Sequence, residues 1–191
     1  MTNTLVDRLH DTISQRQSVG HLVAPAPNQQ QLALAFEAAL AAPDHHRLKP
    51  TRFVIIPSEK RAAFGELLSN SLASTEMDPV QIDRVKNHPF RAPLLVLALT
   101  TLQDHAKVPH YEQILSSGAV IENFLLSLQA QGFASIWRTG AVSESNALKH
   151  ALGLQHRDLI AGIIYIGTAD KHMPARQKIN IDEFVSTWSD A

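Results

Sequence analysis

The 191-residue chain contains no cysteine, which excludes disulfide bonds, thiolate zinc sites and cysteine nucleophiles. It also has almost no net charge, because 17 basic residues stand against 18 acidic ones and the formal charge is −1. Such a balance gives no electrostatic reason to expect a nucleic-acid or anionic-membrane partner. No apolar run approaches the roughly 20 residues of a membrane span, and the start MTNTLVDRLHDTIS is not typical of a signal peptide. We therefore expect a cytoplasmic protein.

Several motifs that reveal a function in other sequences are missing as well. The chain has no G-x-G-x-x-G after a strand, no P-loop, no G-x-S-x-G and no H-E-x-x-H. It has no internal repeat, low-complexity tract or linker, and its length is typical of one domain spanning residues 1–191.

Apolar periodicity predicts a layered arrangement of helices and strands. Helical spacing marks residues 5–15, a segment after Asn28, residues 64–72 and residues 114–128, with short helices starting near Asp78 and Ser143. Short apolar runs at 52–57, 92–101, 133–137 and 159–167 predict strands, of which the first and the last should be buried. Residues 16–27 read as a loop. Strands separated by helices favour an α/β or α+β domain.

The C-terminal tail, residues 168–191, shows no periodicity although it carries apolar side chains near its end. A stretch of about 20 residues without periodicity in a compact domain indicates function, disorder or an arm. Its apolar residues could pack on a partner subunit, or the tail could wrap around its own domain.

Two adjacent histidines in APDHHRLKP, residues 42–50, suggest a metal site, an acid–base pair or a ligand-gripping loop. Adjacent side chains of an extended segment point in opposite directions, and no carboxylate stands at a recognisable ligand spacing from His45 and His46. We therefore expect no metal here.

Basic or polar side chains also follow several of the expected helices and strands. Most such residues in any protein are surface groups that complement helix C-termini. Arg138 is different, because it directly follows the apolar strand FASIW, where an unpaired charge would be half buried and costly. A ligand that carries negative charge would satisfy it.

Four segments in this order resemble the nitroreductase family of FMN enzymes: RQSV, APDHHRLKPTRFVII, SSGAVIENFLLSLQAQGFASIWRTG and LIAGIIYIGTAD. The segment HAKVPHYEQ is similar to one in the compact bacterial YdjA-type NAD(P)H nitroreductases. The resemblance covers essentially the whole chain. It implies an α+β fold with a central, mostly antiparallel sheet flanked by helices, and a homodimer with FMN at the subunit interface.

The resemblance also implies which residues bind the cofactor phosphate and ribityl groups. Arg16, Gln17 and Ser18 match the family's R-[RK]-S loop, and Arg176 or Lys178 of the tail would meet the phosphate. An FMN phosphate carries nearly two negative charges and favours guanidinium groups.

Other positions would lie along the flavin ring. Trp137, Arg138 and Thr139 match the segment that lines the flavin after the long helix, and His45 matches a serine that reaches it from the other subunit. Reduced flavin develops negative charge at its N1–C2=O edge, so a nearby cation stabilises it.

Some positive charge has moved within this pattern. Gln17 replaces a residue that is usually basic, whereas Arg47, Lys49 and Thr51 replace asparagine, glutamine and tryptophan. We expect Arg47 or Lys49 to compensate, so that FMN still binds.

The leading hypothesis is an FMN-dependent oxidoreductase that passes hydride from NADH or NADPH to the flavin and on to a nitro compound, quinone or similar acceptor. The changed arginine pattern leaves open a degenerate member that binds flavin without turnover. A weaker third hypothesis is a metal-dependent hydrolase that uses Asp44, His45 and His46.

Overall fold

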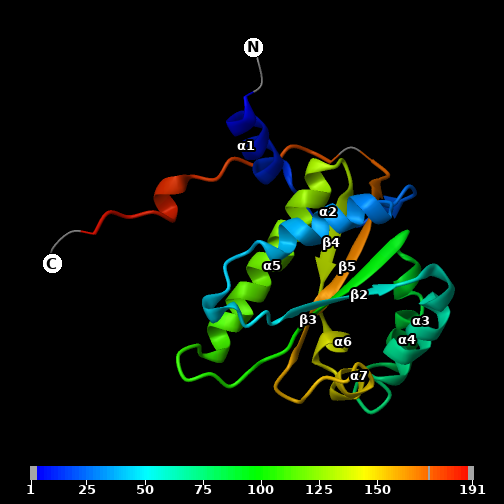
Figure 1. The fold of residues 1–191 in the computed structure, drawn as a ribbon. Coiled ribbons are helices and arrows are strands. Elements are labelled where there is room, and N and C mark those ends of the chain that lie inside the picture. Colours follow the sequence, from blue (N-terminus) through cyan, green and yellow to red (C-terminus); the bar gives the residue numbers. More distant parts are fainter. Residues whose placement is uncertain (1–3, 172, 189–191) are drawn as a thin grey trace.

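A computed structural model describes residues 4–171 and 173–188 of the chain. Its sheet consists of β1 (Leu22–Val23), β2 (Thr51–Ile56), β3 (Leu94–Thr100), β4 (Ala134–Arg138) and β5 (Leu159–Ala169). All pairings between these strands are antiparallel, in the order β1-β5-β3-β2 with β4 also paired to β5. Helices flank the sheet (Figure 1), which confirms the predicted α+β class.

The central strand β3 explains why the sheet can be covered on both faces. Leu95, Leu97 and Leu99 belong to one buried cluster, while Val96 and Ala98 belong to another. Successive side chains of a strand point to opposite faces, so this alternation places one core on each side of the sheet. The nearly continuous apolar runs of β3 and β5 follow from burial on two sides.

Two antiparallel helices, α2 (Gln29–Leu40) and α5 (His110–Ala130), cover one face of the sheet (Figure 1). Three aromatic rings join these helices to the sheet: Phe36 stacks on Phe124 at 4.9 Å, and Phe53 of β2 lies within 5.2 Å of both. Asn28 caps α2 as predicted, and Gly132, with φ of +84°, follows the end of α5.

The opposite face carries α3 (Arg61–Asn70), α4 (Pro79–Val85), α6 (Ala141–Glu144) and α7 (Asn146–Ala151), with short 3-10 turns at Ser58–Lys60 and His88–Phe90. The single helix predicted between Ser143 and Gly153 is wrong. Ser145 has extended dihedral angles and its side chain caps α7 instead, so the segment divides into two helices.

Two predictions about strands also need correction. The segment 16–27 is not only a loop, because Leu22 and Val23 pair with Thr168 and Ala169 of β5. The strand at 51–56 lies at the edge of the sheet, and its Val54 and Ile55 are exposed rather than buried. A pattern of apolar residues identifies a strand but not its position in the sheet.

The helix α1 (Leu5–Gln15) and the tail extend away from the rest of the chain (Figure 1). No residue of α1 is buried, and the Thr4 side chain caps its N-terminus. Beyond Ala169, the described part of the tail contains only the 3-10 turn Ile181–Glu183. The apolar side chains near its end are 65–84% exposed: Ile179, Ile181, Phe184, Val185 and Trp188. These side chains therefore do not wrap onto their own chain.

None of the helices in the described part of the chain combines the length and the apolar content that crossing a membrane requires.

Candidate functional site

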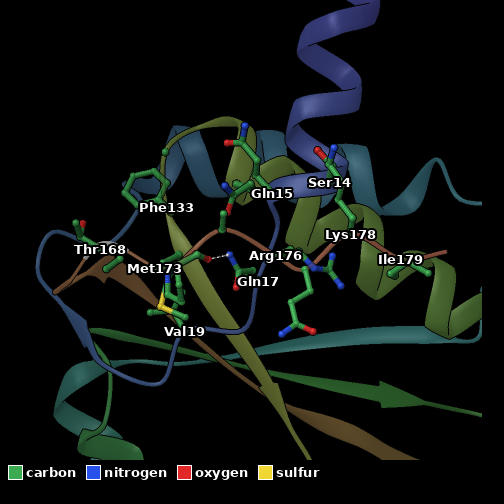
Figure 2. Close-up of a pocket in the computed structure, with 17 residues that line it drawn as sticks. Ser14, Gln15, Gln17, Val19, Phe133, Thr168, Met173, Arg176, Lys178 and Ile179 are labelled. Carbon is green, nitrogen blue, oxygen red and sulfur yellow. Dashed lines mark hydrogen bonds between the residues drawn. The ribbon is translucent and has the colours of Figure 1, made fainter.

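The first of two relevant cavities has a volume of about 850 Å³ and lies between the end of α1, the start of β4 and the tail. Figure 2 shows Gln17, Arg176 and Lys178 around this hollow. The Gln17 amide donates a hydrogen bond to the Pro174 carbonyl at 2.9 Å, and Arg176 donates one to the Arg16 carbonyl at 3.3 Å. The tail is therefore tied to the loop that follows α1, and the two together present four basic or amide side chains to the cavity: Gln17, Arg176, Gln177 and Lys178.

Arg16 and Ser18 lie beside this cavity. The Arg16 guanidinium is 3.5 Å from the Glu122 carboxylate of α5 and is mostly buried. Ser18 is exposed and forms an isolated bridge with Ser135 of β4. The RQS loop thus runs along the free edge of β4.

The second cavity, about 470 Å³, lies at the other end of β4. It is lined by the end of β4 and the residue after it, Trp137, Arg138 and Thr139. Three further polar residues line the same cavity: His88, Arg91 and Tyr165. Its remaining walls are mainly apolar: Leu72, Met77, Val85, Ile136, Val142 and Ile163. The cavity therefore combines an apolar body with a polar edge.

Positive charge dominates that polar edge. Neither Arg91 nor Arg138 forms an ion pair with any described residue. Burial lowers the pKa of His88, and the two guanidinium groups lower it further. Burial raises the pKa of the Tyr165 hydroxyl, which Arg91 and Arg138 partly oppose. At neutral pH the cavity thus offers two unpaired cations, a neutral imidazole and a neutral phenol, a set that suits a planar ligand with an anionic edge.

The RQS loop and β4 lie between the two cavities. The Val19 amide donates to the Ser135 carbonyl at 3.0 Å, and a Cβ placed on Gly20 would lie 3.6 Å from the Arg138 guanidinium. The five residues of β4 span about 13 Å between the two ends. An elongated anionic molecule could therefore contact both cavities along this edge.

His45 and Arg47 lie elsewhere, in the 3-10 turn His45–Arg47 beside the start of α5. The His45 imidazole is 2.6 Å from the Glu112 carboxylate. Glu112 precedes Glu122, the partner of Arg16, by ten residues, which corresponds to about 15 Å along a helix. Within one chain the structure does not bring His45 and Arg47 together with the other candidate residues.

Three residues of the second cavity were missed at the level of sequence: His88, Arg91 and Tyr165. Tyr165 is hidden within an apolar strand, and His88 and Arg91 follow α4 without any motif. Only the tertiary packing of the segment 88–91 and of β5 beside β4 brings them into one cavity. Among the described residues, no group of three or more histidines and carboxylates could hold a metal ion.

Comparison with known proteins gives a consistent result. The family model described as "Nitroreductase family" matches residues 13–168. The Escherichia coli (strain K12) protein named "Putative NAD(P)H nitroreductase YdjA" is 35% identical over 168 residues, which cover 88% of this chain and 91% of that protein.

Two solved structures share the fold. A nitroreductase-like family protein from Bacillus cereus superimposes with a TM-score of 0.82 at 21% identity, covering 94% of this chain and 95% of that one. The FMN and NADPH-dependent nitroreductase NfnB from Sphigopyxis sp. strain HMH gives a TM-score of 0.74 at 17% identity, covering 95% and 99%. Because the family model matches most of this chain and a relative is 35% identical to it, this chain belongs to the nitroreductase family.

Proposed function

We propose that the protein is an FMN-dependent NAD(P)H oxidoreductase that passes hydride from the nicotinamide to the flavin and on to a nitro compound, a quinone or a similar acceptor. The observation that carries this proposal is the second cavity, where Arg91 and Arg138 face a largely apolar space without a described carboxylate partner. Both residues are exposed, so their guanidinium groups are available to an anionic ligand in this cavity, to which guanidinium donates strong hydrogen bonds. Membership of the nitroreductase family and the FMN dependence of the similar NfnB support the same ligand.

The phosphate end of FMN is proposed to bind in the first cavity. Arg176 and Lys178 supply positive charge there, while Arg16, Gln17 and Ser18 supply the loop that runs toward β4. Guanidinium groups favour phosphate because they donate two parallel hydrogen bonds.

The ring end is proposed to bind in the second cavity, against Trp137, Arg138 and Thr139. When bound there, the flavin supplies the group that accepts and releases hydride, and the protein supplies placement and electrostatics. Arg91 and Arg138 would stabilise the negative charge of the reduced ring, and the Tyr165 hydroxyl would donate a hydrogen bond to its polar edge.

We further propose a homodimer in which the loop containing His45 and Arg47 completes the partner's flavin site. Support comes from exposed apolar surface on both sides of that loop, at Leu40 of α2 and at Tyr111 and Leu115 of α5. Side chains of this size rarely gather on the surface of a monomer without a partner. The part of the tail with exposed apolar side chains, from Ile179 to Trp188, would pack on the other subunit.

One observation favours the alternative, a flavin-binding protein without turnover. Gln17 stands where the family usually has a basic residue and its amide is engaged by the tail, while the Arg16 guanidinium already faces Glu122. The phosphate end therefore offers less free charge than the family pattern implies.

An anaerobic visible spectrum of the FMN-loaded protein, recorded before and after NADH or NADPH, tests the proposal. A flavin band that bleaches with either nucleotide and returns with a quinone or nitro compound would support the oxidoreductase. A band that persists would favour the flavin-binding alternative, and no band after addition of FMN would contradict both.

A further inference from the structure

His45 and Glu112 form the shortest pairing of a histidine with a carboxylate in the described part of the chain. The distance between His45 Nδ1 and Glu112 Oε2 is 2.6 Å, and the two side chains are 51% and 30% exposed. A carboxylate that accepts from one ring nitrogen keeps a proton on that nitrogen and fixes the orientation of the imidazole. The other nitrogen, His45 Nε2, is then the atom that takes up and releases protons, and it has no described hydrogen-bond partner.

A second pair nearby is built differently. His110 Nε2 is 3.2 Å from Asp104 Oδ1, but the other oxygen of Asp104 accepts from Arg157 at 2.6 Å. Arg157 is the main reason why the pKa of Asp104 lies below its usual range. The charge of Asp104 is therefore largely engaged by Arg157, whereas Glu112 pairs with no described cation other than His45.

The segment that carries His45 is also held in place by α5 and by the loop that precedes it. Ser116 donates to the Pro43 carbonyl at 2.9 Å, just before His45, and Gln103 donates to the Leu48 carbonyl at 2.7 Å, just after it. Anchors on both sides keep the imidazole in one position, which is what proton transfer to a bound molecule requires.

We propose that His45, held by Glu112, donates the proton that the acceptor needs when it receives hydride, an inference that rests on the oxidoreductase function and the dimeric site proposed above. For a quinone, hydride brings two electrons and one hydrogen to the acceptor. The imidazolium of His45 releases its Nε2 proton to the quinone oxygen, which yields the hydroquinone. His45 becomes neutral. Its Nδ1 keeps a proton that is hydrogen-bonded to Glu112, and its Nε2 takes up a new proton from water.

Two conservative variants isolate this role. In His45→Asn the amide nitrogen can still donate to Glu112, but no proton can be transferred. In Glu112→Gln the contact is kept and the negative charge is lost. His110→Asn is the matched control, because it removes an imidazole with a carboxylate partner on the same turn of α5 and outside the proposed site.

The experiment follows reoxidation of the photoreduced, FMN-loaded protein by stopped-flow spectroscopy, so that no nucleotide is needed. Two oxidants are compared: a quinone, which consumes protons, and ferricyanide, which takes single electrons and no proton. We expect the rate with quinone to fall about 100-fold in His45→Asn and substantially in Glu112→Gln. At equal FMN occupancy the rate with ferricyanide should stay unchanged, His110→Asn should match the original protein, and added imidazole should restore part of the rate in His45→Asn.

A readout on the protein without FMN complements the kinetics. Proton NMR should show a strongly deshielded Nδ1 proton of His45 that moves upfield in Glu112→Gln, where the acceptor has lost its charge, and stays unchanged in His110→Asn. Unchanged quinone rates, or equal losses with quinone and ferricyanide, would overturn the proton-donor role. Photoreduction does not depend on the nucleotide, so failure of NAD(P)H to bleach the flavin would count against the proposed donor alone. A chain that binds no FMN would overturn both proposals.

Discussion

Gly162 in β5 lies where the Trp137 indole crosses the sheet. Its φ of +153° is unfavourable for any residue with a Cβ, and a Cβ there would overlap the indole and lie 2.7 Å from the Arg138 carbonyl oxygen. We expect Gly162→Ala to lower the free energy of unfolding by about 2 to 4 kcal/mol, because both the backbone and the indole must move. Urea unfolding measures the loss.

Gly118 in α5 provides the matched control, because a Cβ added there meets nothing within 4 Å. Gly118→Ala should raise the free energy of unfolding by about 0.5 to 1 kcal/mol, since alanine restricts the unfolded chain and favours the helix. Similar effects of the two substitutions would contradict the close approach of Trp137 to Gly162.

His88 makes the stability of the protein depend on pH. Its pKa lies below the ordinary imidazole value of 6.5, first because of burial and then because of Arg91 and Arg138. The unfolded chain therefore binds a proton more readily than the folded one, and this residue costs stability as the pH falls below about 6.5. Replacing it by His88→Gln removes that cost.

Urea unfolding at pH 7.5 and at pH 5.5 tests this sign. The difference in free energy of unfolding between the original protein and His88→Gln should shift in favour of the variant at the lower pH. An unchanged difference would show that His88 is not held in its neutral form by the fold.

At the scale of single elements, the capping box at the N-terminus of α2 stabilises a helix that packs on the core. The Asn28 side chain accepts from the Gln31 amide, and the Gln31 side chain accepts from the Asn28 amide, each at 2.9 Å. Asn28→Ala should lower the free energy of unfolding by about 1 kcal/mol. Asn70→Ala, at the exposed end of α3, should stay within about 0.5 kcal/mol of the original protein; equal effects at both sites would argue against the cap.

At the scale of the whole molecule, α1 and the tail are the parts whose apolar side chains have nothing to pack on within the chain. Leu9 lies at the centre of α1 and is 58% exposed. If this helix packs on a second subunit, Leu9→Glu should raise the dimer dissociation constant about tenfold or more. Asp11→Lys, on the opposite side of the helix, should not. Sedimentation of both variants decides, and a stable monomer of the original protein would contradict the proposed dimer.

Local signals were sufficient for most elements of the fold. The spacing of Leu5, Leu9 and Ile13, the Asn28 cap, and the apolar runs of β3 and β5 all depend on a few neighbouring residues, and the structure confirms each of these elements. The exposed position of β2 and the division of the helix at Ser145 were missed, because both depend on what lies beside the segment.

Of the candidate site, the sequence and its family resemblance pointed to the RQS loop, the segment 137–139 and two basic tail residues. The structure places these around two cavities at the ends of β4. The partner of His45 on α5, Glu112, is about 15 Å along the helix from Glu122, the partner of Arg16. Whether a second chain closes that distance remains a prediction.

The sequence by itself determined the order of helices and strands and the loops that bear charge, because periodicity and caps are properties of the chain. The order of its motifs carried the family resemblance, and that resemblance implied the α+β class. Only the tertiary structure decided that His88, Arg91 and Tyr165 share a cavity with Arg138, and that Glu112 holds His45. Those contacts join residues far apart in the sequence, and they form only when the sheet and its helices pack together.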